Sequence, residues 1–168
     1  FEEICEDYGY QVEKHMVVTK DDYINTVFRV IAKDAPELKQ GQSRPAVILT
    51  HGLVDSSDTW IMNGKKSLAF ILADAGYDVW AANFRGNKHS KHHLTLDVEA
   101  DYRYYEQGSM IEQAKFDLPA FFEYIEMTCH VQNVTVISHS MATSAVIYGL
   151  AKNKDYYEQH VNAFVGMG

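Results

Sequence analysis

The 168-residue sequence has few cysteines, few prolines and no long apolar run. Its two cysteines, Cys5 and Cys129, allow one disulfide or none, which excludes a disulfide-rich scaffold and leaves the pairing open. No apolar stretch approaches the roughly 20 residues that a membrane-spanning helix needs. The chain does not start with a basic segment followed by an apolar one, so we expect a secretory leader to be absent or already removed.

Positive charge is also scarce. Lys and Arg number 15 against 23 Asp and Glu, which gives a formal net charge of −8. Because the basic residues are dispersed, the sequence disfavours a nucleic-acid partner, which would need a basic face. It also lacks electrostatic attraction for anionic lipid, so any membrane contact would have to be hydrophobic. With 46% hydrophobic residues, the chain can bury a core without a metal or disulfide.

The first third of the sequence predicts an antiparallel hairpin. Residues 11–18 alternate between apolar and polar, residues 20–22 are typical of a turn, and residues 23–31 are again rich in strand formers. Residues 33–45 are polar and contain two prolines and Gly41, which predicts a loop.

The rest of the chain alternates predicted strands and helices. The predicted strands are residues 46–50, 77–82, 134–137 and 161–167. The predicted helices are residues 67–75, 111–125 and 143–152. Gly76 is expected to end the first helix, and Pro119 to kink the second or divide it in two. Between them, residues 83–108 form a long polar stretch. This alternation predicts an α/β fold whose parallel sheet is covered by helices on both faces.

The strongest chemical signal is the segment from Ser138 to Ala142, which lies between a predicted strand and a predicted helix. In a nucleophile elbow, a strained turn of this kind lifts the serine hydroxyl clear of the sheet. Strand and helix then pass so closely that only small residues fit two positions either side of the serine, here Ser138 and Ala142. Ser140 is therefore the predicted nucleophile, although the motif alone fits a helix-capping serine equally well.

A second signal, His51-Gly52-Leu53, directly follows the predicted strand at residues 46–50. In the α/β-hydrolase fold, the loop after this strand supplies one N–H group of the oxyanion hole, and the residue after the serine supplies the other. We therefore expect the backbone amides of Leu53 and Met141 to hold an oxyanion with fixed dipoles.

With these motifs the sequence resembles the acid lipases, meaning the gastric and lysosomal lipases and their sterol-ester hydrolase relatives. The resemblance rests on Trp60 after the HGL segment, SLAFILADAGYDVW at residues 67–80, NFRGN at 83–87, AKFDLPA at 114–120, and the elbow. It implies the N-terminal half of an α/β-hydrolase fold and a lipid ester or lipid interface as partner. It also implies an acyl-enzyme at Ser140, no metal or organic cofactor, and a secreted or lysosomal location.

The sequence departs from the family pattern at several positions. Ser138, Met141 and Ala142 stand where the family usually has glycine, glutamine and glycine, and Asp22 replaces a glycine of the hairpin turn. The family's proteins are longer, and their catalytic acid and histidine lie beyond the length matched here. We therefore expect residues 1–168 to be the N-terminal part of a single domain that lacks the cap and the C-terminal catalytic segment.

After Ser140, only Asp155, Glu158 and His160 are candidates for the missing acid and base. They fall at the end of the helix after the elbow and in the short connection that follows, too far from Ser140 to act on it. The fragment alone is therefore predicted to be inactive, its partner being the rest of its own fold or other protein subunits. The alternative function is a non-catalytic lipase-like subunit that binds a lipid or a protein.

Several other side chains have simpler interpretations. His89, His92 and His93 lie among polar residues and predict a solvated loop rather than a metal site. Three tyrosines at positions 102, 104 and 105 predict a loop that packs on the sheet edge or on the cap. His139 is expected to point to the side opposite Ser140, as a packed rather than a catalytic histidine. Trp60 and Trp80 are expected in the core, with Trp60 also able to border an acyl pocket.

Overall fold

A computed structural model of the protein describes residues 1–35, 37–39 and 41–168. The strands are β1 (Tyr10–Val18), β2 (Tyr23–Ala32), β3 (Ala46–Thr50), β4 (Asp78–Ala82), β5 (His92–His93), β6 (Val134–His139) and β7 (Val161–Met167). The α-helices are α1 (Glu2–Asp7), α2 (Leu68–Asp74), α3 (Arg103–Glu106), α4 (Met110–Glu112), α5 (Leu118–Cys129), α6 (Met141–Lys152) and α7 (Lys154–His160). Shorter turns are the 3₁₀ segments η1 (Ser57–Trp60) and η2 (Gly64–Lys66) and the π-helical turn η3 (Gln113–Asp117).

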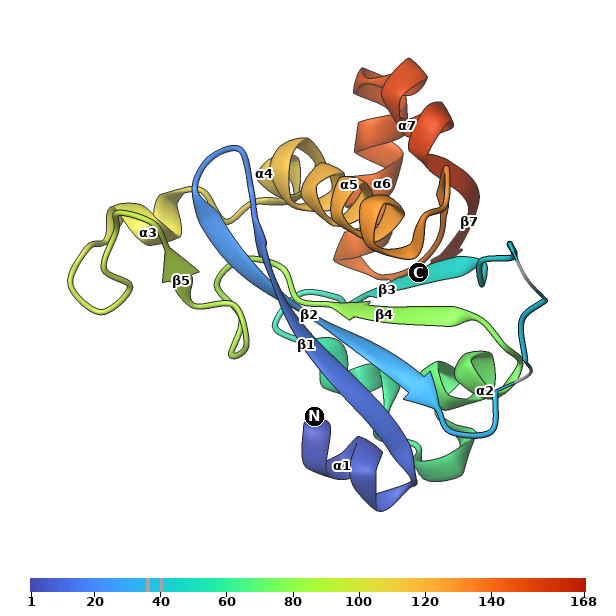
Figure 1. The fold of residues 1–168 in the computed structure, drawn as a ribbon. Coiled ribbons are helices and arrows are strands. Elements are labelled where there is room, and N and C mark those ends of the chain that lie inside the picture. The colour runs from blue at the N-terminus through green and yellow to red at the C-terminus, as the bar shows by residue number, and fades with distance from the viewer. Residues whose placement is uncertain (36, 40) are drawn as a thin grey trace.

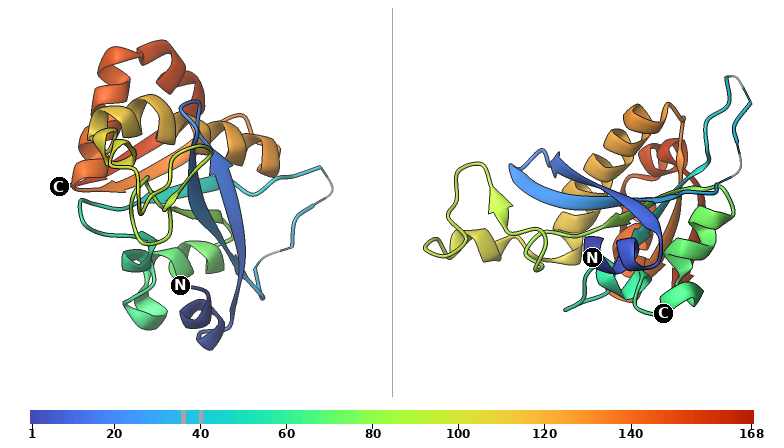
Figure 2. Two further views of the ribbon diagram at one scale, coloured as in Figure 1. Left: turned by 90° about the vertical axis from the view of Figure 1, so that its left-hand side faces the viewer. Right: turned by 60° about the horizontal axis from the view of Figure 1, so that its bottom comes forward.

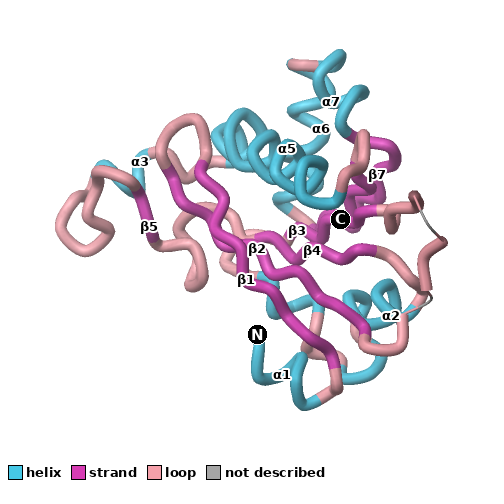
Figure 3. The backbone as a smooth tube through the Cα atoms, viewed as in Figure 1, coloured by secondary structure: helices cyan, strands magenta, loops and turns pink. Residues whose placement is uncertain are grey.

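One mixed sheet organises the molecule, with strand order β1-β2-β4-β3-β6-β7 and the short β5 paired to β2 (Figure 1). β1 pairs with β2, and β2 with β4, in antiparallel register. β4, β3, β6 and β7 run parallel to one another. The antiparallel hairpin followed by parallel strands confirms the predicted fold class, and Figure 3 shows the strands as one continuous layer.

Helices cover both faces of this sheet (Figures 1 and 2). Because successive side chains of a strand point to opposite faces, Val47 and Leu49 of β3 pack in the cluster that contains α2 residues. Ile48 of β3 and Trp80 of β4 pack in the other cluster, with residues of α5 and α6. Trp60 is also buried, so both tryptophans lie in the core as expected.

The predicted elements agree closely with the observed ones in the parallel part of the sheet. The strands predicted at residues 46–50 and 161–167 have the observed bounds of β3 and β7, and the hairpin strands differ by one residue at an end. Six elements were missed: α1, η1, η2, β5, α3 and α7. The last corrects the expectation of a short connection after α6, since residues 154–160 are helical. The described residues of 33–45 form no helix or strand, while residues 36 and 40 of that predicted loop lie outside the described part.

The interruption expected at Pro119 takes the form of the π-helical turn η3. The Leu118 N–H bonds to the Gln113 carbonyl, five residues back, instead of to Ala114. Pro119 has no N–H to offer Ala114 in its place, so the Ala114 carbonyl has no backbone donor from the helix. The hydroxyl of Tyr157 in α7 donates to that carbonyl over 2.7 Å. The Tyr157 side chain thus supplies the hydrogen bond that the π-helical turn η3 leaves the Ala114 carbonyl without.

Gly149 of α6 makes room for this tyrosine. A Cβ atom at position 149 would lie 2.0 Å from Tyr157 Cζ and 2.4 Å from the hydroxyl oxygen. We expect Gly149→Ala to lower the free energy of unfolding by about 1–3 kcal/mol, because the ring must move and overpacking of a core has this cost. Gly108→Ala is the matched control, because its new Cβ would meet only the Tyr105 carbonyl at 3.6 Å. Equal urea midpoints for the two variants would contradict the prediction.

The described residues also bear on the predictions about the cysteines and about membrane-spanning helices. Cys5 and Cys129 are both buried and both free, so the structure contains no disulfide between them. None of the described helices is long and apolar enough to cross a membrane.

Candidate active site

Ser140 lies in the sharp turn between β6 and α6. Its backbone has φ 51° and ψ −118°, a region that side-chain-bearing residues rarely adopt. Its N–H donates to the carbonyl of Met167 at the end of β7 over 2.7 Å, which clamps the turn against the neighbouring strand. The side chain itself is exposed. The expectation of an unusual backbone between a parallel strand and a helix is confirmed, and strain of this kind clusters at functional sites.

Small side chains flank the turn, as the close approach of strand and helix requires. Ser138 is fully buried, and its hydroxyl accepts a hydrogen bond of 2.7 Å from Thr50 Oγ1, its register partner on β3. Ala142, the second residue of α6, is fully buried in the core. The departures from glycine at these two positions are therefore compatible with the elbow geometry, since the one polar group among them has a partner.

The loop after β3 lies beside the serine. A Cβ atom on Gly52 would lie only 3.1 Å from Ser140 Cβ, so a larger residue would press against the elbow. The next residue, Leu53, follows on this loop with its side chain 64% exposed. Met141 is the first residue of α6, and the N–H of a first helical residue has no acceptor inside its helix. The two segments expected to supply oxyanion donors are thus brought together around Ser140.

A buried histidine supports this loop. The ring of His51 contacts the Gly52 carbonyl through Nδ1 at 2.8 Å, and its Nε2 accepts from the backbone N–H of Phe84 at 3.1 Å. Burial lowers the pKa of His51, against the opposing influence of the Gly52 carbonyl and of Asp55. The imidazole is therefore neutral at pH 7 and serves as a fixed structural group of the loop.

No side chain among the described residues is hydrogen-bonded to the Ser140 hydroxyl. Of the three downstream candidates, His160 pairs with Glu126 of α5 at 2.8 Å and Glu158 with Lys154 at 3.5 Å. His160 directly precedes Val161, which pairs with Val134 at the start of β6, whereas Ser140 follows the end of that six-residue strand. At about 3.3 Å per residue, roughly 20 Å separate the two ends. The expectation that these candidates do not reach Ser140 is confirmed for His160.

His139, the last residue of β6, has an exposed side chain beside the loop after β3. Its Nδ1 lies 3.1 Å from the point where a Gly52 Cβ would be, as Ser140 Cβ does, so both residues border the loop after β3. The ring is therefore packed against the glycine loop, and it makes no hydrogen bond to the serine hydroxyl in the described structure. That the ring points to the side opposite Ser140 stays a prediction.

Some of the histidines and tyrosines of the polar stretch make specific contacts, unlike the side chains of a fully solvated loop. His89 Nε2 pairs with Asp58 at 2.8 Å, and His93 lies in β5, edge-on to Tyr23. Tyr104 is buried, donates to the Ser90 carbonyl over 2.9 Å and packs against Tyr23 of β2. Tyr102 and Tyr105 are 75% and 58% exposed, so only one of the three tyrosines packs on the sheet as expected. Sequence patterns missed these contacts because β5 is only two residues long. No group of three or more potential ligands in the described part of the chain is placed to hold a metal ion.

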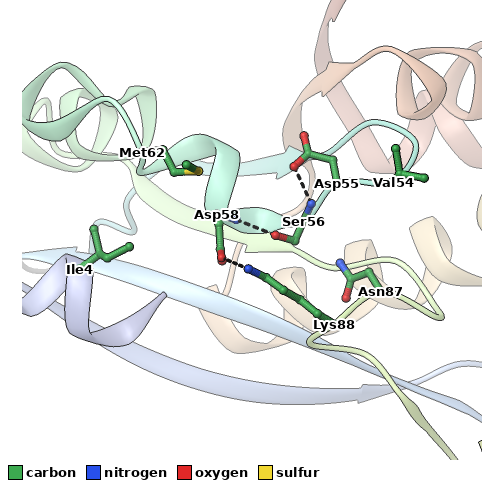
Figure 4. A pocket seen from close by; sticks show the side chains of 8 residues that line it. All are labelled: Ile4, Val54, Asp55, Ser56, Asp58, Met62, Asn87 and Lys88. Atoms are coloured by element: carbon green, nitrogen blue, oxygen red, sulfur yellow. Dashed lines mark hydrogen bonds and ion pairs between the residues drawn. The ribbon is translucent and has the colours of Figure 1, made fainter.

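A cavity of about 530 Å³ opens beside the loop (Figure 4). Ile4, Val54 and Met62 supply apolar lining, and an ion pair between Asp58 and Lys88 lies on another side. Val54 is fully exposed and has φ 52°. A β-branched residue in the left-handed region is strained, so the loop holds this apolar side chain in solvent at an energetic cost.

Two family models together match the whole chain. Residues 45–168 match a model described as the alpha/beta hydrolase fold, and residues 1–64 match one described as a partial alpha/beta-hydrolase lipase region. Among solved structures, an esterase of Pyrococcus furiosus aligns with a TM-score of 0.59 and 20% identity, over 89% of this chain and 49% of that one. An epoxide hydrolase of Vigna radiata aligns with a TM-score of 0.62 and 16% identity, over 92% and 39%. At these identities the structures show the fold alone.

Curated relatives are closer in sequence. Lipase 3 of Drosophila melanogaster is 35% identical over 158 residues, which cover 94% of this chain and 39% of that protein. Human Lipase member M is 41% identical over 143 residues, which cover 84% and 33%. The resemblance to lipases inferred from the motifs is thereby confirmed. The chain spans between a third and two fifths of the length of these two relatives.

Proposed function

Because this chain belongs to the α/β-hydrolase fold family, we propose that it is the N-terminal part of a serine ester hydrolase that cleaves fatty-acyl esters of glycerol or a sterol. The observation that carries the proposal is the backbone of Ser140, φ 51° and ψ −118°, at the end of β6 and against the Gly52 loop. Similarity to lipases over most of the chain supports an ester substrate with a lipid acyl group. The exposed apolar side chains of Leu53, Val54 and Met62 beside the loop suit contact with hydrocarbon.

The reaction follows from these positions. Ser140 Oγ attacks the acyl carbon as its proton passes to a histidine base supplied by the C-terminal part of the fold, and the N–H groups of Leu53 and Met141 hold the oxyanion. The alcohol leaves with that proton, and an acyl-enzyme ester remains on Ser140. Water then attacks the ester, releases the fatty acid and restores the hydroxyl. Neither a metal nor an organic cofactor takes part in these steps.

A fluorophosphonate probe tests the assignment, because it reacts only with an activated serine. We expect the protein expressed from its full reading frame to be labelled, and Ser140→Ala to abolish the labelling. Ser144→Ala is the matched control, since Ser144 is an exposed serine one turn further along α6. Labelling that survives Ser140→Ala would identify another nucleophile. A folded full-length protein that is not labelled would overturn the enzymatic proposal in favour of a non-catalytic lipase-like subunit.

A further inference from the structure

The turn after β4 contacts the loop after β3 through one amide side chain. This loop, residues 51–53, carries the predicted oxyanion donor Leu53 and is called the oxyanion loop below. Asn87 Nδ2 lies 3.0 Å from His51 Nε2, across 36 residues of sequence. The same Nδ2 lies 2.8 Å from the Oδ1 of Asn83. Asn87 belongs to the NFRGN segment, but no local sequence pattern indicates its partner. The contact joins a residue of no assigned role to the histidine that supports the predicted oxyanion donor.

The orientation of the Asn87 amide is determined by its other contacts. Its Oδ1 accepts backbone N–H groups from His89 at 2.9 Å and Ser90 at 3.1 Å. A backbone N–H can only donate, so the oxygen must face these two groups and the NH₂ must face His51. Asn87 is therefore a donor to His51 Nε2.

The state of the His51 ring follows from its donors. Both Asn87 Nδ2 and the Phe84 N–H donate to Nε2, so this nitrogen carries no proton. A neutral ring then carries its proton on Nδ1, which donates to the Gly52 carbonyl over 2.8 Å. The titratable side chains whose charge acts on the pKa of the ring are Asp55, which raises it, and His89, which lowers it. The ring of His139 also lies against Gly52.

The Gly52 carbonyl in turn orients the next amide. The described chain contains no cis peptide, and in a trans peptide the C=O and the following N–H point in opposite directions. We propose that Asn87 is a positioning residue of the oxyanion hole: together with the Phe84 N–H, its amide keeps Nε2 of His51 unprotonated, and the resulting Nδ1–H holds the Gly52 carbonyl and so keeps the Leu53 N–H turned toward the substrate. The catalytic consequence rests on the proposed function, whereas the state of His51 does not.

The test is Asn87→Asp, which keeps the shape and both contacts of Oδ1 but replaces the donor with an acceptor. In long-range ¹H–¹⁵N spectra of ¹⁵N-histidine-labelled full-length protein, we expect wild-type His51 to show a protonated Nδ1 and an unprotonated Nε2. The His51 signals are assigned by their loss in His51→Gln. In Asn87→Asp the carboxylate forms a charge-assisted hydrogen bond at Nε2 that competes with the Phe84 N–H, so we expect the ring proton to move from Nδ1 to Nε2. Because one oxyanion donor is then misaligned, we expect kcat on a p-nitrophenyl ester to fall by about 10²-fold, with KM little changed.

Asn83→Asp is the control for a merely structural effect. It makes the same chemical change four residues earlier and disrupts the donation from Asn83 Nδ2 to the Thr26 carbonyl, without a contact to His51. We expect the Nδ1–H form of His51 to persist in this variant. A wild-type His51 protonated at Nε2 would overturn the proposal without any variant, as would an unchanged ring in Asn87→Asp or an equal change in Asn83→Asp. If the full-length protein has no esterase activity, the ring measurement still decides the role of Asn87.

Discussion

Purified residues 1–168 are expected to release p-nitrophenol from a short-chain ester no faster than the uncatalysed reaction. A general base must lie within about 3 Å of the hydroxyl that it deprotonates. In the described residues no side chain is bonded to the Ser140 hydroxyl, and His160 is bound to Glu126 at the opposite end of β6. Without a base, Ser140 remains a neutral alcohol and a weak nucleophile.

The matched measurement uses the full reading frame. There we expect hydrolysis, and Ser140→Ala is expected to lower kcat by about 10⁶-fold, as loss of the nucleophile does in a serine protease. Each protein is first checked for secondary structure by circular dichroism, so that the assay compares folded chains. Hydrolysis by residues 1–168 that disappears in Ser140→Ala would contradict the prediction. It would mean that a base within this chain reaches the serine.

Much of the fold could be predicted because its signals are local. The buried strand at residues 46–50 is a continuous apolar run, and in the structure all five of its residues are buried. The hairpin shows alternation, and the stripe of residues 111–125 shows helical spacing. Each of these patterns is contained within the element that it predicts, and the elbow and the HGL loop are likewise contiguous motifs.

The missed features depend on contacts between distant residues. The short strand β5 exists because it pairs with β2, and η3 is stabilised by Tyr157, 43 residues after Ala114. The same holds for the site: Asn87 gains its role only when the turn after β4 meets His51 across 36 residues. A single sequence gives no signal for such pairs, because nothing in the local spacing of one partner depends on the other.

The second prediction with a large effect concerns Arg85, whose side chain is 1% exposed. Its Nη2 donates to Asp117 at 2.7 Å, its Nη1 to Asp21 at 2.6 Å, and its guanidinium lies 3.9 Å from the centre of the Tyr23 ring. Arg85→Leu leaves the fully buried Asp117 without its cation. We expect the free energy of unfolding to fall by about 3–5 kcal/mol, the usual cost of breaking a buried ion pair from one side.

Urea denaturation measures this loss as a lower midpoint with an unchanged slope. Arg103→Leu is the control, because the exposed pair that Arg103 makes with Asp101 contributes only about 0–1 kcal/mol. Equal midpoints for the two arginine variants would contradict the argument.

A double variant separates the buried charge from the packing of Arg85. In Arg85→Leu with Asp117→Leu, the stranded carboxylate is gone, and apolar replacement of a whole buried ion pair is often neutral or stabilising. We therefore expect the double variant to be more stable than Arg85→Leu alone. If it is instead less stable, the Asp117 carboxyl stabilises the fold through a partner other than the guanidinium, such as the Arg85 backbone N–H at 3.4 Å. Both variants lose the contacts of the guanidinium with Asp21 and the Tyr23 ring, which tie the hairpin to the turn after β4. Because that turn also carries Asn87, loss of these Arg85 contacts would disturb the oxyanion loop as well as the core.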